Sequence, residues 1–235
     1  ILGNPSNFEN NDPHGHPHPG NYLGMMYKGG YLVPILMGLM MIVISVIIER
    51  YITIRVAYGK GSVPGFVRRI KGLLDNNDLN GAIKACDTQR GSVANVIREG
   101  LRKYNEMAAM PGLEKDQKVL AIQKEIEEAT SLELPMLEKN LVILATISSI
   151  ATLMGLLGTV LGMIRAFSAI ATAGAPDAVA LSTGISEALI NTALGISTSA
   201  IAIISYNYFT TQIDGLTYGI DEAGFSIAQN FAAKH

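Results

Sequence analysis

Hydroxyl side chains recur at helical spacing inside two apolar stretches of this 235-residue chain. The first stretch has members spaced four, three, four and three residues apart, which places them on one helix face: Ser148, Thr152, Gly155, Thr159 and Gly162. The second stretch carries a comparable stripe: Asn191, Gly195, Thr198 and Ala202, with Thr192 and Ser199 beside it. A hydroxyl both donates and accepts hydrogen bonds, so it can pass a proton without carrying charge. Close packing of membrane helices also explains the small residues, and spacing alone leaves both interpretations open.

A single acid, Glu187, stands within the second of these stretches. If the helix starts near Pro176, a rise of about 1.5 Å per residue places Glu187 roughly 16 Å along it, near mid-depth of a bilayer. A charged carboxylate there costs about 2.5–3.5 kcal/mol and normally faces a bundle interior or a water-filled cavity. A later helix start makes Glu187 an interfacial residue, and the sequence does not settle the start.

Three stretches are apolar and long enough to cross a membrane. The composition is 49% hydrophobic and 16% charged, whereas a soluble domain carries about 25% charged residues. The stretches are bounded by Lys28 and Glu49, by Asn140 and Arg165, and by Glu187 and Asp214. Each holds about the 20 helical residues that a bilayer requires. The sequence therefore predicts an all-α integral membrane protein with three transmembrane helices.

Positive charge is concentrated between the first two stretches, where 15 of the 18 Lys and Arg residues lie. Directly after the first stretch, six basic residues follow with no acid among them: Arg50, Arg55, Lys60, Arg68, Arg69 and Lys71. By the positive-inside rule, we expect the N-terminus to lie outside and the large loop and the C-terminus to be cytoplasmic. The expected organisation is a polar tail (1–29), span one (30–48), a helical cytoplasmic domain (49–139), span two (140–165), a periplasmic loop (166–180), span three (181–209) and a C-terminal helix (210–235).

The cytoplasmic segment reads as a series of amphipathic helices. One has apolar residues on one side, suited either to anionic headgroups or to packing on the next helices: Phe66, Val67, Ile70, Leu73 and Leu74. Two short helices should break at Gly91, and the helix after residue 115 should run on past Pro135 towards span two. The one cysteine, Cys86, cannot form an intrachain disulfide and reads as a small buried residue.

The sequence gives little support for a metal site, a hydrolase or a nucleic-acid-binding protein. His14, His16 and His18 alternate in a Pro-rich tail without a Cys or carboxylate cluster, so no metal site or cofactor is expected. The remaining histidine is His235, which leaves an intramembrane hydrolase without a base in its spans. An enzyme is therefore not expected. The net charge of −2 is uninformative about nucleic acid, and no nucleic-acid partner is predicted.

Two runs carry a specific resemblance: "LVILATISSIATLMGLLGTVLGMIRAF" (141–167) and "GISEALINTALGISTSAIAIISYNYF" (184–209). Together with "VIIERYITI" (46–54) and the three-span plan, they resemble the MotA/TolQ/ExbB proton-channel family, most closely its ExbB branch, with TolQ next. By motif, Thr159 and Thr192 match the pore threonines of the family, and Glu187 matches its span-three acid. Ser148, Thr152, Gly155, Asn191, Gly195 and Ser199 become candidate pore-lining residues.

The resemblance implies a homopentameric ring in the bacterial inner membrane, with protons as the coupling ion. Spans two and three would line a pore around a dimer of single-span, ExbD- or TolR-like partners whose aspartate is protonated and deprotonated. A TonB- or TolA-like protein would receive the energy. A TonB-type role in outer-membrane transport is the leading expectation; a TolQ-like envelope role, a gliding or flagellar-type stator and a non-conducting scaffold stay open.

Two residues depart from the family pattern. Thr152 stands where proline is common, and Arg165 stands where many relatives have an uncharged residue. We expect Arg165 to pair with Asp177 across the loop that follows span two.

Overall fold

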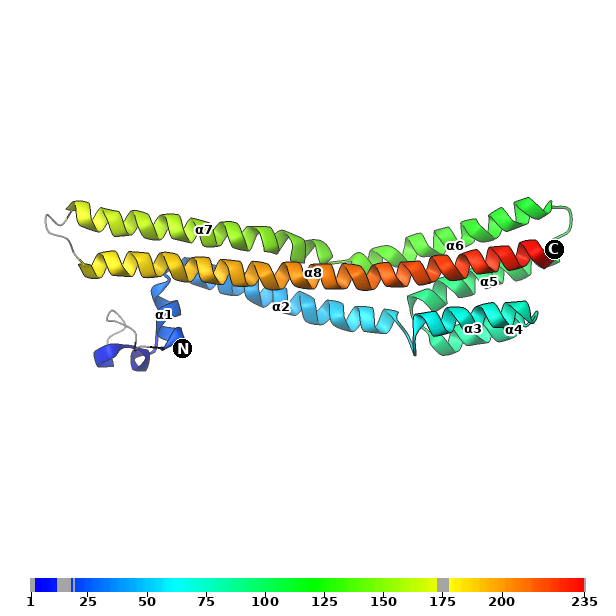
Figure 1. Cartoon of the computed structure of the whole chain (residues 1–235), viewed down its shortest axis with the longest axis horizontal. Coiled ribbons are helices and arrows are strands. Elements are labelled where there is room, and N and C mark those ends of the chain that lie inside the picture. The colour runs from blue at the N-terminus through cyan, green and yellow to red at the C-terminus, as the bar shows by residue number, and fades with distance from the viewer. Residues whose placement is uncertain (1–2, 12–17, 19, 173–177, 235) are drawn as a thin grey trace. The chain divides into compact units, whose positions relative to one another are not determined.

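The computed structural model describes residues 3–11, 18, 20–172 and 178–234, and every regular element in these ranges is a helix. Two short 3-10 helices, η1 (Pro5–Asn7) and η2 (Glu9–Asn11), precede the α-helices, which Figure 1 labels along the chain. These are α1 (Tyr22–Lys28), α2 (Leu32–Ala57), α3 (Val63–Asp75), α4 (Leu79–Gln89), α5 (Ser92–Ala109), α6 (Lys115–Glu138), α7 (Leu141–Thr172) and α8 (Ala178–Lys234).

Within the described residues, three helical segments are long and apolar enough to cross a membrane, as the sequence predicts. The first is Leu32–Ala57, the second lies within Lys115–Ser168 and the third within Leu181–Lys234. The predicted all-helical, multi-pass membrane architecture is confirmed at this level. The helices themselves continue beyond the predicted spans, because a helix does not end where its apolar stretch meets the first charged residue.

The chain divides into two compact units. The apolar unit comprises Ile1–Ile47 and Val142–Tyr206, and the charged unit comprises Ile48–Leu141 and Asn207–His235. In the apolar unit α7 and α8 lie side by side (Figure 1). Because both helices carry glycine where they meet, their backbones approach closely.

The charged unit is a bundle built on α3, α4, α5, α6 and the end of α8. Its core includes Ile97, Leu101 and Ile122, and the rings of Tyr104 and Phe231 meet edge to face at 4.9 Å. The apolar side of α3 is buried against this unit, which decides between the two roles predicted for that side: protein packing accounts for it.

Backbone geometry places the breaks in this bundle. The helices α4 and α5 separate at Arg90 and Gly91, both with positive φ, as predicted at Gly91. The helix predicted to run on past Pro135 towards span two does pass this proline, but it ends at Glu138 and is not continuous with α7. Pro135 remains inside α6, and the chain turns at residues 139–140, where Asn140 has φ +67°. Pro135 offered the visible breaker signal, whereas the break depends on Asn140, a residue type that tolerates the left-handed region.

Cys86 is 2% exposed in this core. Burial raises the pKa of its thiol to about 12, so the reactive thiolate is scarce at neutral pH. The prediction of a buried, unreactive cysteine therefore agrees with its position.

Candidate functional site

The seam between α7 and α8 is defined by glycines that face one another. A Cβ added at Gly155 would lie 3.1 Å from the Cα of Gly195, and one added at Gly162 would lie 2.7 Å from the carbonyl oxygen of Gly184. Both distances are shorter than ordinary contacts of a Cβ, so only glycine fits without a shift. The predicted stripes of small residues on the two spans thus do meet.

Two hydroxyl pairs bridge this seam. The Thr159 and Thr192 Oγ1 atoms are hydrogen-bonded to each other, and the Oγ atoms of Ser148 and Ser199 lie 3.4 Å apart. The sequence placed Ser148 and Thr159 on one stripe of span two, and Thr192 and Ser199 beside the stripe of span three. The structure brings these four residues together in pairs. All four side chains are partly exposed rather than sealed in the seam.

The threonine pair converges on a backbone carbonyl. Both hydroxyls approach the Gly155 carbonyl oxygen at 3.3 Å, and Thr192 also approaches the Ala188 carbonyl at 3.1 Å. Each hydroxyl has one proton to donate and two lone pairs to accept with. The pair can therefore present an accepting or a donating oxygen to a group beside it, which is the property that a titrating carboxyl in low dielectric needs.

Glu187 does not lie in this hydroxyl seam. Its carboxylate oxygens approach Nη1 of Arg165 at 2.5 and 2.7 Å, and the ion pair links the C-terminal part of α7 to the N-terminal part of α8. The expected partner of Arg165, Asp177, lies outside the described residues, and the described geometry instead gives Arg165 to Glu187. The role of Glu187 in proton handling stays a prediction.

Two further predicted pore residues have other surroundings. The amide of Asn191 is fully buried and donates from Nδ2 to the Gly29 carbonyl at 2.8 Å, which ties α8 to the segment before α2. Thr152 is exposed and donates to the Ser148 carbonyl of its own helix at 3.3 Å. Neither side chain contributes to the two hydroxyl bridges.

Sequence reasoning missed two contacts that organise these helices. The turn at Gly29 and Gly30 packs against α8. The sequence signal for this turn was the Gly-Gly pair at the start of span one. Arg50 is buried at 2% exposure and donates from Nη1 to the Leu137 carbonyl at 3.0 Å. Its position after an apolar span suggested only a topology signal.

No group of three metal-ligating side chains occurs among the residues that the structure describes. His14 and His16 lie outside the described residues, and His18 is exposed. The candidate site is therefore the pair of hydroxyl bridges on the α7–α8 seam, with the Arg165–Glu187 ion pair as its charged neighbour.

The model of the MotA/TolQ/ExbB proton channel family matches residues 89–222, which include both threonines, Arg165 and Glu187. The chain belongs to this family. The resemblance seen in the span motifs is thereby confirmed. The turn at Gly29 and Gly30 and the cation Arg50 lie outside the matched residues.

Curated relatives come from both the Tol and the Exb branches. The chain is 32% identical over 124 residues to the "Tol-Pal system protein TolQ" of Pseudomonas aeruginosa, covering 53% of this chain and 54% of the relative. It is 36% identical over 85 residues to the "Biopolymer transport protein ExbB" of Pseudomonas putida (36% and 26% covered). It is 40% identical over 70 residues to that of Salmonella typhimurium (30% and 29% covered). The chain thus spans about half, or less, of the length of these relatives.

Proposed function

We propose that the chain is the channel subunit of a proton-driven motor in the bacterial inner membrane, energising a TonB-type system for outer-membrane transport. Five copies would form a ring whose pore is lined by α7 and α8. A dimer of single-span, ExbD- or TolR-like partners would occupy the pore, and a TonB- or TolA-like protein would receive the motion. The distribution of Lys and Arg supports a periplasmic N-terminus and a cytoplasmic C-terminus.

The observation that carries this proposal is the hydrogen bond between Thr159 and Thr192, in a chain of the proton-channel family. A partner carboxyl that reaches the pair can donate to a threonine oxygen when protonated and accept from a hydroxyl when ionised. The threonines thus satisfy the carboxyl in both states. This lowers the cost of moving it between them in low dielectric.

The two branches of the family predict different outputs. Relatives named ExbB support the transport role, and the TolQ relative matches over the longer stretch, which favours an envelope-maintenance role as the second candidate. The sequence identity does not separate them, so the experiment needs a readout for each.

The test is complementation of a strain that lacks this chain. Thr159→Val and Thr192→Val keep the side-chain shape but remove the hydroxyl, and Thr146→Val is the matched control. Thr146 is an exposed threonine of α7 that donates to the Val142 carbonyl of its own helix, at 2.7 Å. Energy-dependent uptake of a ferric chelate reports the TonB role, and detergent sensitivity reports the envelope role.

We expect both seam variants to lose the affected readout by at least about tenfold, the effect of removing one essential proton-handling group, while Thr146→Val complements fully. Native mass spectrometry of each extracted variant should show the mass of five chains when the variant is expressed alone. With the co-expressed partner, the mass should rise by that of two partner copies. Full complementation by Thr159→Val and Thr192→Val would contradict the proton-handling role. A wild-type mass of one or two chains would contradict the ring.

A further inference from the structure

The Arg165–Glu187 ion pair is strongly asymmetric in its exposure. The Arg165 side chain is 49% exposed and that of Glu187 only 9%, although both oxygens of the carboxylate approach the same guanidinium nitrogen. A buried carboxylate depends on its partner, because it has lost water as an alternative. The guanidinium, by contrast, is only half covered by the chain. The position of Glu187 therefore depends on the ion pair more than the position of Arg165 does.

A turn of the N-terminal segment rests on this pair. Gly30 has φ +74°, and a Cβ there would overlap the Glu187 carboxylate, so the backbone approaches the acid directly. The guanidinium of Arg165 lies over the ring of Tyr31, 5.3 Å from its centroid, within cation–π distance. One helical turn further along α8, Asn191 donates to the Gly29 carbonyl. Three consecutive residues, Gly29–Tyr31, thus contact the pair or the next turn of α8.

The face of α8 that carries Glu187 differs from the face that carries Thr192. Five residues separate them, and at 3.6 residues per turn this places their side chains about 140° apart around the helix. Thr192 and Ala188 face α7 at the glycine seam, whereas Glu187 and Asn191 lie between α7, where they meet Arg165 and Gly158, and the Gly29–Tyr31 turn. The carboxylate is thus directed away from the threonine pair.

We propose that Glu187 is a positioning residue: with Arg165 it forms a fixed charge pair that latches the Gly29–Tyr31 turn onto α7 and α8, and it does not relay protons. This rests on the proposed function for its activity readout, but the latch itself is a structural statement. It extends beyond the family assignment, because the latched turn lies outside residues 89–222.

Three variants separate a latch from a relay: Glu187→Gln, Arg165→Gln and the double variant. A relay needs an ionisable group at position 187, so both variants that replace Glu187 would be inactive and Arg165→Gln would not rescue. A latch gives a different order. Arg165→Gln strands a buried carboxylate and is the worst, Glu187→Gln leaves a cation that is only half covered by the chain, and the double variant pairs two amides without any stranded charge.

The direct readout is hydrogen–deuterium exchange of the full chain in nanodiscs, followed in the peptide covering residues 22–31. We expect Arg165→Gln to accelerate exchange by at least about tenfold, because a stranded buried charge opens the latch. The double variant should return to within about threefold of wild type, a difference of less than about one kcal/mol. Arg165→Lys keeps the charge and should remain closer to wild type than Arg165→Gln, which covers a failure of the Gln variant to fold.

The second readout is complementation, with Thr159→Val as the control for the proposed function. We expect activity in the double variant to exceed that of Arg165→Gln alone. Thr159→Val should abolish activity without changing exchange at residues 22–31. An inactive double variant with wild-type exchange would overturn the inference and make Glu187 a relay. Unchanged exchange in Arg165→Gln would overturn the latch itself. If Thr159→Val is active, the proposed function fails and the latch is decided by exchange alone.

Discussion

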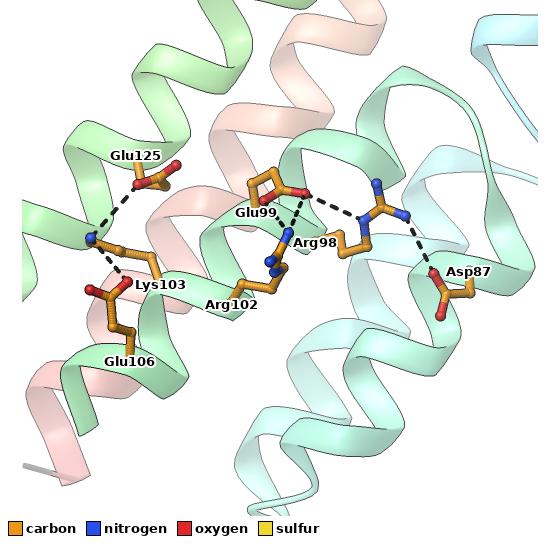
Figure 2. Close-up of polar contacts among 7 residues, drawn as sticks. All are labelled: Asp87, Arg98, Glu99, Arg102, Lys103, Glu106 and Glu125. Atoms are coloured by element: carbon orange, nitrogen blue, oxygen red, sulfur yellow. Dashed lines mark hydrogen bonds and ion pairs between the residues drawn. The ribbon is translucent and has the colours of Figure 1, made fainter. Parts of the chain in front are cut away.

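The two units use ion pairs in different surroundings. In the charged unit, seven residues of α4, α5 and α6 form the ion-pair network drawn in Figure 2, which consists of two separate groups: Asp87, Arg98, Glu99 and Arg102, and Lys103, Glu106 and Glu125. Its Arg102–Glu99 pair, at 3.1 Å, has side chains 67% and 34% exposed. In the described part of the apolar unit, the Arg165–Glu187 pair has an acid that is only 9% exposed.

The comparison shows that burial, more than the distance between charged atoms, decides what an ion pair does. An exposed pair exchanges water for a partner at little net gain, about 0–1 kcal/mol, and salt screens it. A buried acid that loses its partner leaves an uncompensated charge, at a cost of about 3–5 kcal/mol. The network of the charged unit is therefore surface support, whereas Arg165–Glu187 constrains the backbone around it.

We expect the largest loss of stability from a substitution of Arg50, which is a buried cation in the unit whose other ion pairs are mostly exposed. Arg50 is 2% exposed, is ion-paired with Glu49, and donates to the carbonyls of Met136 and Leu137. These carbonyls belong to the last turn of α6, where intrahelical partners run out. Arg50→Leu leaves them unsatisfied, and we expect a loss of about 3 kcal/mol.

The measurement for Arg50→Leu is thermal unfolding in detergent, followed by circular dichroism. A loss of this size corresponds to a lowering of the midpoint by roughly 10 °C. Arg55→Leu is the matched control, because Arg55 is an exposed arginine of the same helix whose Nη1 lies 3.4 Å from the Tyr51 hydroxyl. Equal midpoints for the two variants would mean that burial does not separate these cations.

The next largest loss of stability should come from the apolar unit, where the backbone of Gly30 contacts the buried acid Glu187. Gly30→Ala places a Cβ against the carboxylate and forces alanine to adopt φ +74°. We expect a cost of about 1–3 kcal/mol. Gly38→Ala is the control, because nothing lies within 4 Å of its added Cβ and alanine favours a helix interior. A midpoint for Gly30→Ala at or above that of Gly38→Ala would contradict the close approach.

The predictable part of this molecule is the part that periodicity and hydropathy encode. The three spans follow from uninterrupted apolar runs, and the stripes of small residues identify the helix faces that carry Thr159 and Thr192, although not the hydrogen bond between them. The break at Gly91 also has a local cause that the sequence displays. These features depend on neighbours within a few residues or on one helix face.

The features that were missed depend on contacts between residues far apart in the chain. No local pattern shows that Arg165 meets Glu187 or that Asn191 reaches Gly29, because each contact needs the docked helices. The prediction of one continuous helix through residues 139–140 was wrong for a different, local reason. Its visible breaker, Pro135, is tolerated inside α6, and the turn instead uses an asparagine in the left-handed region.

The smallest effect should come from the exposed network. Arg102→Gln removes the charge that faces Glu99 at 3.1 Å and keeps a residue of similar helix propensity. Because both side chains retain water, we expect a change in the free energy of unfolding within about 0.5 kcal/mol. The thermal midpoints of wild type and variant should coincide at about 0.5 M salt, where screening removes the remaining attraction. A loss comparable to that of Gly30→Ala, persisting in salt, would mean that the network of Figure 2 acts as a cooperative unit. Exposure would then no longer be the property that separates the ion pairs of the two units.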